Sequence, residues 1–413
     1  MSWGGSSPRL RPANMVHQMM ATKISPAPRA SSSSSVMGRY HSVVAVLLIV
    51  GTLVGCGSVP VRAPVTSPVA APARPAPAAP AEGSLSQARG TWVPVPWSEL
   101  PGWGSDNLFE AWNAWLKSCE KSAPPWAALC PEVRRLSIGS AQEQLAWMQA
   151  RLQAYRIEAA PGESTGLLTS YFEPVIEASR VPAPGFTVPL YGPPPGLAQR
   201  KPWYTRQEMD TLPEAQAVLK GRAIAYMADP VDALILQIQG SGRVRMAQAD
   251  GSQRWVRLAY AGTNDQPYRS VGRWLLDQGL VKDASWPGIK TWLSQNPGRQ
   301  QELLWSNPRV VFFKEETLSD LESAFGPRGA QGVALTPGRS IAVDPGSIPY
   351  GTPVWLVSPG PQTSLQKLVL AQDTGSAITG AVRADYFAGW GSEAGDLAGR
   401  LRQPLQMWAI WPK

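Results

Sequence analysis

The chain contains 413 residues, of which 44% are hydrophobic and 16% charged, and its formal net charge is +8. This length allows one large domain or two ordinary ones, each with its own hydrophobic core. The two histidines, His17 and His41, both precede an apolar run that ends at Cys56. If that run is a cleaved signal, the mature chain has no histidine, which excludes a Ser-His-Asp triad, a Cys-His pair and a His-ligated metal site. Proton transfer then has to come from carboxylates, Lys, Tyr or Cys.

Residues 1–55 are predicted to be an export signal. The apolar stretch from Val43 to Val54 is too short to cross a hydrocarbon core of ~30 Å comfortably. It follows Arg39 with no acidic residue upstream, which is typical of a signal peptide. Its end, Leu53-Val-Gly-Cys56, resembles the cleavage box of bacterial lipoproteins, so Cys56 is the expected lipidation site. An ordinary signal peptide or a buried apolar segment is the alternative.

The segment after the signal is expected to hold the protein to a membrane. Because Gly57 rather than Asp follows Cys56, we expect a lipid anchor in the outer membrane of a Gram-negative bacterium, on its periplasmic face. Residues 56–90 contain the lipidated cysteine and a Pro/Ala-rich stretch that cannot bury enough apolar surface to fold, so they are predicted to form an extended tether.

The charge balance changes once the signal is removed. Residues 1–55 carry five basic and no acidic residues, so their loss lowers the net charge to about +3. No stripe of Lys and Arg stands out, and a nucleic-acid partner is therefore not expected. The two other cysteines, Cys119 and Cys130, are candidates for a short-loop disulfide in an oxidising periplasm. We expect no metal site and no cofactor.

The predicted elements change from mainly helical to mainly β along the chain. Helices are predicted over 109–117 and after the capping box Ser140-Ala-Gln-Glu143, where Leu145, Met148, Leu152 and Tyr155 recur at helical spacing. Strands are predicted over 166–173 and 233–239, and three helices over 267–279, 287–295 and 299–306. The C-terminal third has short strands over 310–313, 340–343, 352–357, 367–371 and 406–411, separated by Gly/Pro turns. This pattern favours a β-barrel, and most tryptophans are expected in its core or at its rim.

The densest group of acidic residues lies near the C-terminus. Asp373 and Asp385 flank a Gly-rich turn, and Asp344 precedes them. The turn would let two short strands return side by side and bring both carboxylates into one pocket, where burial and the neighbouring charge raise a carboxyl pKa. A protonated acid is what cleavage at a glycosidic oxygen requires. From the residues alone, the simpler interpretation is that both aspartates cap turns.

Motifs along nearly all of 91–413 resemble, in order and spacing, the membrane-bound lytic murein transglycosylase A family, whose C-terminal part is a "3D" domain named for three aspartates. The matching segments are Tyr171-Phe-Glu-Pro-Val-Ile-Glu177, Tyr204-Thr-Arg206, Leu236-Gln-Ile-Gln-Gly-Ser-Gly-Arg243, Asn307-Pro-Arg-Val-Val-Phe-Phe313, Thr336-Pro-Gly-Arg-Ser340, Val343-Asp-Pro345, Ile348-Pro-Tyr-Gly351, Gln372-Asp-Thr-Gly-Ser-Ala-Ile378, Arg383-Ala-Asp-Tyr-Phe387 and Gly391-Ser-Glu-Ala-Gly395.

The resemblance implies a mainly β fold with a few helices. A double-psi β-barrel would be formed by residues 91–178 and 309–413. A smaller β-rich domain, residues 179–308, would be inserted between them, and the substrate groove would run between the two.

The resemblance also implies an activity on peptidoglycan glycan strands. Family members cleave the β-1,4 bond between N-acetylmuramic acid and N-acetylglucosamine without water, because the 6-hydroxyl of the muramic acid attacks its own anomeric carbon and gives a 1,6-anhydro product. One carboxyl group then suffices as acid and afterwards as base. Asp385 is the expected catalytic residue, Asp373 supports it, and Asp344 and Arg383 are expected to be structural. Whether Arg383 faces the same pocket and restrains the raised pKa is left open.

Four residues are expected to bind the substrate. They are Tyr171, which we prefer to Trp390 as a groove-lining aromatic residue, Glu173, Gln239 and Ser241. Gln237 and Gln239 are two residues apart and would share one face of a strand. Gln239 is preferred because it is nearer the Gly240-Ser-Gly242 turn. A phosphate-binding loop at this turn is excluded, because no third glycine follows at Arg245.

Two other functions remain open at this point. One is a hydrolase of the same bond, in which Glu173 or Asp373 is the base that activates a water. The other is a non-catalytic lipoprotein that only binds peptidoglycan. The expected partners are glycan strands and the outer membrane, and other cell-wall synthases or hydrolases are open candidates.

Overall fold

A computed structural model describes residues 81–361 and 363–413. The predicted signal, the lipidation site Cys56 and most of the tether lie outside these residues. In the described part of the chain, no helix has the length and apolar character needed to cross a membrane.

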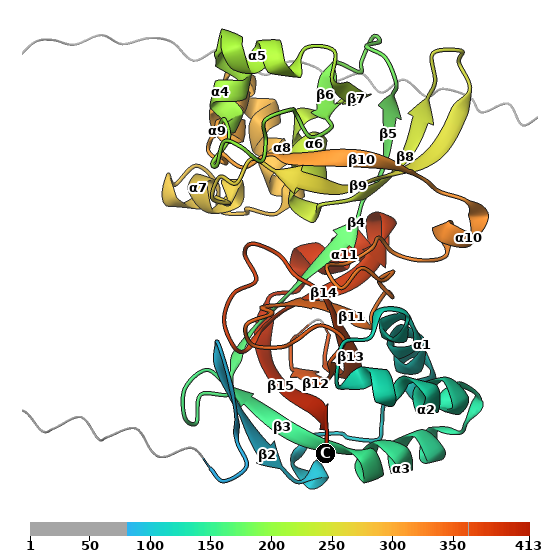
Figure 1. Ribbon diagram of the computed structural model, residues 1–413. Coiled ribbons are helices and arrows are strands. Elements are labelled where there is room, and N and C mark those ends of the chain that lie inside the picture. The colour runs from blue at the N-terminus through green and yellow to red at the C-terminus, as the bar shows by residue number, and fades with distance from the viewer. Residues whose placement is uncertain (1–80, 362) are drawn as a thin grey trace, which may run out of the picture. The chain divides into compact units, whose positions relative to one another are not determined.

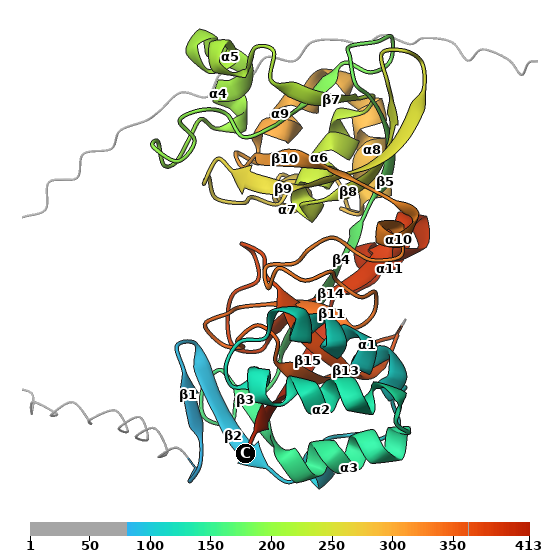
Figure 2. The same cartoon turned by 45° about the vertical axis from the view of Figure 1, so that its right-hand side comes forward.

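The larger sheet has nine strands and closes on itself (Figures 1 and 2). Its strands in spatial order are β1 (Leu85–Gln87), β2 (Gly90–Val95), β3 (Leu152–Glu158), β15 (Gln403–Pro412), β12 (Pro353–Ser358), β13 (Leu365–Asp373), β11 (Ser340–Val343), β14 (Arg383–Trp390) and β4 (Gly166–Glu173). Because β4 pairs with β15 as well as with β14, the last six strands form a closed barrel. The predicted mainly β fold, with a barrel formed by both ends of the chain, is confirmed.

The barrel strands are apolar on both faces because each face is covered. Val354, Leu356 and Val369 belong to one buried cluster within the barrel sheet. Trp355 and Leu368, one position along, belong to a second cluster with the helices α1 (Leu108–Ser118), α2 (Cys130–Arg135) and α3 (Ala141–Arg151). Since successive side chains of a strand point to opposite faces, this double burial explains the continuous apolar runs of β12 and β13. Trp92, Trp112, Trp115 and Trp355 are all fully buried, so they contribute to the core.

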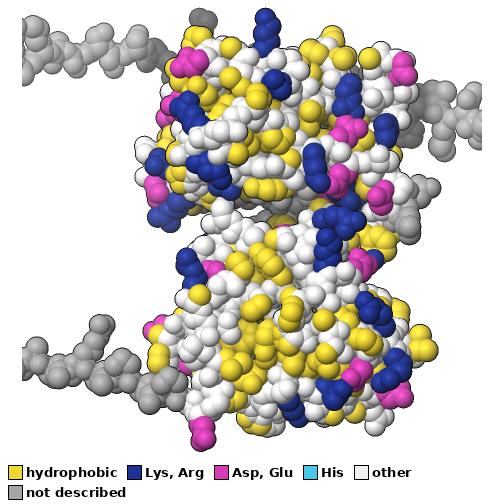
Figure 3. Space-filling view, in the orientation of Figure 1, with side chains coloured by type: hydrophobic (Ala, Val, Ile, Leu, Met, Phe, Trp, Pro, Cys, Tyr) yellow, Lys and Arg dark blue, Asp and Glu magenta, His cyan; other side chains and the backbone are white. Residues whose placement is uncertain are grey.

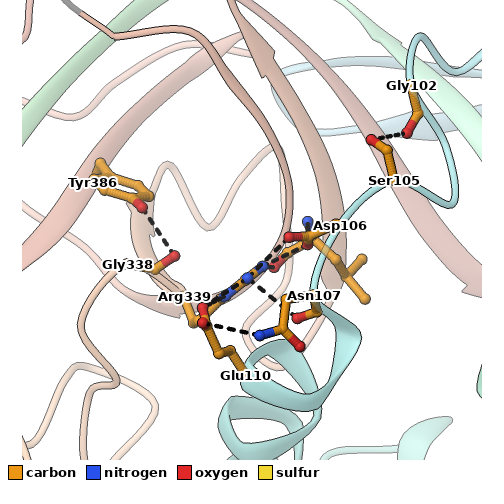
Figure 4. A network of polar contacts seen from close by, with 9 residues as sticks. Gly102, Ser105, Asp106, Asn107, Glu110, Gly338, Arg339 and Tyr386 are labelled. Carbon is orange, nitrogen blue, oxygen red and sulfur yellow. Dashed lines mark hydrogen bonds and ion pairs between the residues drawn. The ribbon is translucent and has the colours of Figure 1, made fainter. Parts of the chain in front are cut away.

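Arg339 fastens the first helix to the barrel. Its side chain is 1% exposed and forms ion pairs with Asp106, at 2.5 Å, and with Glu110, at 2.9 Å (Figure 4). It also donates to the carbonyls of Asn107 and Leu368. The start of α1 is therefore held against β13. At the other end of α1, a disulfide joins Cys119 to Cys130 at the start of α2.

The second sheet has six strands and is built from residues 175–317. In spatial order its strands are β10 (Val311–Thr317), β9 (Gln253–Thr263), β8 (Gly242–Ala247), β5 (Val175–Ser179), β7 (Ala223–Met227) and β6 (Val188–Tyr191). The helices of this region are α4 (Arg206–Thr211), α5 (Pro213–Leu219), α6 (Pro230–Gln239), α7 (Val271–Asp277), α8 (Trp286–Gln295) and α9 (Gln300–Trp305). The remaining elements are α10 (Asp320–Ser323), α11 (Gly391–Arg400) and the 3-10 turns Trp97–Glu99, Cys119–Lys121, Trp126–Ala128, Leu136–Ile138 and Pro297–Arg299.

The segment 233–239, predicted to be a strand, forms all but the first three residues of the ten-residue helix α6. Asp229 caps this helix by accepting from the N–H of Val231 at 2.7 Å, and Gly240 ends it with φ +83°. The helix packs on the second sheet through Ala233 and Leu236 and on α7–α9 through its other side. A helix buried on two sides shows no amphipathic period, and a short apolar run of this kind cannot be told from a buried strand by its pattern.

The helix predicted from the capping box is present but ends earlier than the pattern suggests. Ser140 and Glu143 form the reciprocal capping box of α3. The helix ends at Arg151, and Leu152 and Tyr155, which continue the helical spacing, lie in strand β3. Tyr155 pairs with Ala409 of β15, so sheet pairing overrides the local helical pattern.

Candidate active site

The register of four neighbouring strands aligns the candidate acidic residues. Ala342 of β11 is paired with Asp373 of β13 on one side and with Asp385 of β14 on the other. Asp385 is in turn paired with Thr169 of β4. Paired residues have their side chains on the same face of a sheet, so the four form one row across the barrel. With adjacent strands ~4.8 Å apart, the two aspartates are about 10 Å apart at the backbone.

Hydrogen bonds around Asp385 distinguish its two oxygens. The Thr169 hydroxyl donates to Oδ1 of Asp385, and Nη2 of Arg383 donates to the Thr169 Oγ1 at 2.8 Å. A guanidinium group can only donate and a hydroxyl has a single proton, so Thr169 must use that proton toward Asp385. Oδ1 is therefore an acceptor, and Oδ2 is the oxygen left to carry an exchangeable proton.

Burial raises the pKa of the Asp385 carboxyl above its ordinary value. The hydrogen bond from Thr169 and the positive charge of Arg383 lower this pKa, while the negative charge of Asp373 raises it. Desolvation disfavours the charged form of a carboxyl group, so Asp385 keeps its proton to a higher pH than an exposed aspartate does. Arg383 does face this pocket and restrains the shift.

Asp373 accepts a donor at each oxygen. The Tyr171 hydroxyl donates to its Oδ2 at 2.8 Å, and the backbone N–H of Ala330 donates to its Oδ1 at 2.9 Å. Burial raises the pKa of Asp373, and the hydrogen bonds from Tyr171, Thr374 and Ala330 lower it. The pKa of Tyr171 is raised well above its ordinary value by burial and by the charge of Asp373. Tyr171 therefore remains a neutral donor, and Asp373 orders this tyrosine and the loop around Ala330.

Asp344 supports the loop that connects the other two aspartates. It is 6% exposed, accepts from the N–H groups of Gly346 and Gly380 at 2.9 and 2.8 Å, and forms an ion pair with Arg89 at 3.3 Å. Gly380 lies between Asp373 and Asp385 in the chain. Asp344 lines neither of the two cavities described next, so its contribution is to the shape of this loop.

Two cavities meet beside these aspartates. The larger has a volume of about 550 Å³ and includes Asp373 and Ser241 in its lining. The smaller has a volume of about 280 Å³ and includes Asp385 in its lining. Residues that line both are Tyr171, Gln239, Arg309, Gly375 and Ser376. A saccharide chain that passes through both cavities would contact residues of the barrel and of the second sheet.

The two glutamines of α6 have different partners. Gln239 lines both cavities, and its Oε1 accepts from the N–H of Phe172 at 3.0 Å, which leaves its amide nitrogen for a ligand. Gln237 lines the smaller cavity, and its Oε1 accepts from Arg206 at 2.7 Å. Because these residues lie on a helix, the prediction that they share one strand face is wrong. Ser241, in the larger cavity, follows Gly240 at the end of this helix.

Glu173 does not lie in either cavity. Its side chain is fully buried and receives hydrogen bonds from Arg243 at 2.8 Å and from Arg257 at 2.6 Å. Glu173 is therefore not brought together with the other predicted substrate-binding residues, and its carboxylate is engaged by the two arginines. Trp390 is likewise occupied, because the Arg243 guanidinium lies 3.7 Å from the centre of its ring.

Three residues of the site were missed by the sequence analysis: Thr169, Tyr268 and Arg309. Thr169 precedes Tyr171 by two residues on a predicted strand, so strand periodicity alone would have placed both on one face. Tyr268 lines the cavity of Asp385, and its pKa is raised by burial and by the charge of Asp385. Arg309 lies in the family-like segment Asn307-Pro-Arg-Val-Val-Phe-Phe313, but that segment was not assigned to the site. Nothing in the local sequence marks Tyr268.

Within residues 81–361 and 363–413, no group of three or more His, Cys, Asp and Glu side chains could hold a metal ion. On the face shown in Figure 3, basic and acidic side chains are interspersed, without one continuous basic stripe.

Family models match two parts of the chain. The MltA specific insert domain matches residues 167–314, and the 3D domain matches residues 339–411. Among curated proteins, membrane-bound lytic murein transglycosylase A of Vibrio cholerae is 31% identical over 274 residues, and that of Escherichia coli K12 is 32% identical over 273 residues. Each match covers 63% of this chain and 70% of the relative.

Solved structures show the same likeness. The lytic transglycosylase LtgG of Burkholderia pseudomallei is 41% identical, covers 82% of this chain and all of its own, and has a TM-score of 0.54. MltA from Neisseria gonorrhoeae is 28% identical, with 80% of this chain and 94% of its own covered and a TM-score of 0.66. E. coli MltA with bound chitohexaose is 26% identical, with 74% and 90% covered and a TM-score of 0.61. With its barrel, its aligned aspartates and these relatives, the chain belongs to the membrane-bound lytic murein transglycosylase A family of peptidoglycan lytic transglycosylases.

Proposed function

We propose that this enzyme cleaves the β-1,4 bond between N-acetylmuramic acid and N-acetylglucosamine in peptidoglycan and releases 1,6-anhydromuramic acid ends. The observation that carries the proposal is the state of Asp385: a half-buried carboxyl group in the lining of the smaller cavity, with one oxygen fixed by Thr169, the other oxygen left for a proton, and a pKa raised by desolvation. The chitohexaose bound to E. coli MltA supports a glycan ligand for the groove.

A single carboxyl group can carry out both halves of this reaction. Protonated Asp385 donates to the glycosidic oxygen while the bond from that oxygen to C1 of the muramic acid breaks. The resulting carboxylate takes the proton of the muramic acid 6-hydroxyl, whose oxygen forms the new bond to C1. Asp385 ends protonated as it began, and no water is consumed. Because the nucleophile is part of the substrate, its orientation entropy is already lost before the reaction.

The supporting roles follow from the contacts. Asp373, which already accepts from Tyr171 and Ala330, orders the site and raises the pKa of Asp385 through its charge. Gln239, Ser241 and Tyr171 would bind the sugar chain. We retain the proposal that residues 91–178 and 309–413 form the barrel domain and 179–308 the inserted domain, and that Cys56 anchors the enzyme to the outer membrane.

The direct test is Asp385→Asn, assayed by muropeptide release from purified sacculi. Loss of a general acid lowers rates by ~10²–10⁴-fold, so release should fall by at least this factor while sacculus binding persists. Asp396→Asn is the matched control, because Asp396 is exposed on α11 and, within the described part of the chain, pairs with Arg400 alone. Undiminished release by Asp385→Asn would refute the role of Asp385.

The mass of the products separates this proposal from a hydrolase. A lytic transglycosylase releases anhydro ends, each lighter by one water than the reducing ends that a hydrolase releases. Mass spectrometry of muropeptides released by the wild-type enzyme is expected to show anhydro ends. Reducing ends as the main product would instead support the hydrolase.

A further inference from the structure

Arg309 lies where the two cavities meet, and it is the one basic residue in the lining of both. The larger cavity also contains Lys314 and Arg328, and the smaller one contains Arg383. Arg383 is already engaged with Thr169 and with the carbonyls of Leu167 and Ala384. Lys314 pairs with Glu316 at 2.8 Å. Of these cations, Arg309 is thus the one that a chain running through both cavities would pass in each of them.

A polar network holds Arg309 in place. Its N–H donates to the Oδ1 of Asn307 at 3.2 Å, and its carbonyl accepts from Nη2 of Arg206 at 2.6 Å. Its Nη1 donates to the carbonyl of Gln266 at 3.0 Å. Asn307 is only 2% exposed, and buried polar groups of this kind are costly unless they are satisfied. The backbone of Arg309 is therefore held on both sides, and its guanidinium is fixed at one nitrogen.

The remaining donors of the guanidinium have no hydrogen-bond partner among residues 81–361 and 363–413. A guanidinium has five N–H groups in a planar fork, and in the described part of the chain only Nη1 of Arg309 makes a hydrogen bond. The carboxylate of Asp265 feels the charge of Arg309 but pairs with Lys201 at 3.0 Å. A half-buried arginine with free donors in a ligand cavity is suited to bind an acceptor with two oxygens or a carbonyl.

The substrate has one such group that distinguishes its two sugars. Muramic acid carries a lactyl branch at O3, which ends in a carboxyl group or in the amide that begins the peptide stem, and glucosamine lacks this branch. The muramoyl unit must lie beside Asp385, because Asp385 protonates the glycosidic oxygen attached to C1 of that unit. Arg309 lines the same cavity as Asp385.

We propose that Arg309 is a specificity-determining residue that binds the carboxyl or carbonyl oxygen of the 3-O-lactyl branch. The assignment rests on the proposed function of the same site. It explains how the groove distinguishes the muramoyl units of a glycan strand from the glucosamine units, which lack the lactyl branch. It also assigns the free donors of Arg309 to a substrate group that chitin does not have.

The test measures binding by calorimetry in the inactive Asp385→Asn protein, so that turnover does not interfere. Two ligands are compared: chitohexaose, which has no lactyl branch, and short glycan strands freed of peptides by an amidase, which carry lactyl carboxylates. Arg309→Gln is expected to weaken binding of the glycan strands about tenfold or more, since hydrogen bonds to a charged group contribute ~1.5–3 kcal/mol. Binding of chitohexaose is expected to stay unchanged.

Two variants serve as comparisons. Arg309→Lys keeps the charge without the planar fork, and it should retain part of the affinity for the glycan strands. Arg245→Gln removes an exposed arginine on β8 that pairs with Glu177 outside both cavities, and it should bind both ligands as the parent protein does. Equal melting temperatures of the four proteins show that the effects do not come from unfolding.

The outcomes separate this inference from the proposed function. If Arg309→Gln lost the same affinity for chitohexaose as for the glycan strands, the inference would be overturned. Arg309 would then bind a group common to both sugars, such as the acetamido carbonyl. Unchanged binding of both ligands by Arg309→Gln would overturn it as well. If the Asp385→Asn protein with Arg309 intact bound neither ligand, the proposed function would fail, and the role of Arg309 would fail with it.

Discussion

Thr169 links the two charged groups nearest the proposed reaction. It accepts from Arg383 and donates to Asp385, so its single hydroxyl decides which oxygen of Asp385 keeps the proton. The same hydrogen bond lowers the pKa of Asp385, against the burial that raises it. At the scale of single residues, the pKa of Asp385 is thus set by burial, which raises it, against the hydrogen bond from Thr169, which lowers it.

Thr169→Val should alter the pH dependence of the reaction. Loss of the hydroxyl removes a contribution that lowers the pKa of Asp385, so that pKa rises further. The enzyme needs Asp385 protonated and loses activity as pH rises through this pKa, so the alkaline limb of the kcat profile should move to higher pH. We expect kcat to fall roughly ten- to hundredfold, because a hydrogen bond to a charged group contributes ~1.5–3 kcal/mol.

Thr169→Ser is the control for this change, because it keeps the hydroxyl and should keep both the pH profile and most of the rate. The measurement is muropeptide release across the pH range. An alkaline limb that stays in place in Thr169→Val would contradict the role given to this hydrogen bond.

Helix α6 shows how an element positions groups of the site. It begins at a cap formed by Asp229 and ends at Gly240, whose φ of +83° belongs to the left-handed region. Its last residue, Gln239, and the following Ser241 both line the larger cavity. The conformation of Gly240 therefore sets the direction in which the chain leaves the helix beside the ligand groove.

Gly240→Ala should destabilise the protein by roughly 1–2 kcal/mol, because a side chain in the left-handed region costs about this much. A Cβ at Gly240 would meet no atom within 4 Å, so the cost is conformational rather than steric. Gly298→Ala is the matched control: its Cβ also meets nothing within 4 Å, but its φ is not in the left-handed region. It should be neutral or slightly stabilising. Urea unfolding of both variants checks the difference, and equal stabilities would contradict it.

At the scale of the whole molecule, one buried cluster joins segments that are far apart in the chain. Glu173, at the end of β4, binds Arg243 of β8 and Arg257 of β9. Both arginines also donate to the carbonyl of Phe325, on the segment that returns from β10 to the barrel. Arg243 stacks on Trp390 of β14 as well. The cluster therefore stabilises both chain segments that connect the two sheets, the one between β4 and β5 and the one between β10 and β11.

Glu173→Gln is expected to lower the free energy of unfolding by about 3–5 kcal/mol, because it leaves two buried guanidinium groups without a counter-charge. Glu177→Gln is the control. It removes an exposed partner of Arg245 and should cost at most about 1 kcal/mol. Denaturant unfolding provides the comparison. A loss in Glu173→Gln no larger than in the control would show that the cluster does not hold the two sheets together.

Much of the fold and part of the site could be predicted from the sequence, because they depend on neighbours within a few residues. The capping box at Ser140 marks the start of α3, and alternation along β4 places Tyr171 on one face with Thr169. The Gly-rich turn between Asp373 and Asp385 let the sequence predict that the two aspartates lie near each other. The structure differs in detail, because β11 lies between their strands and the two carboxyl groups line adjoining cavities rather than one pocket. The absence of histidine after residue 55 indicated that a carboxyl group would have to move the proton.

The tertiary structure alone decided which polar residues are free to act. Glu173 looks like a site residue next to Tyr171, yet Arg243 and Arg257, 70 and 84 residues further along the chain, bury and neutralise it. Arg309 belongs to a family-like segment to which no site role was assigned, yet the second sheet brings it into both cavities, with guanidinium donors that are free among the described residues. Local patterns determine the elements because capping and periodicity are short-range effects. Burial and ion pairing involve segments distant in sequence, so only the folded chain determines which charges remain available for the substrate.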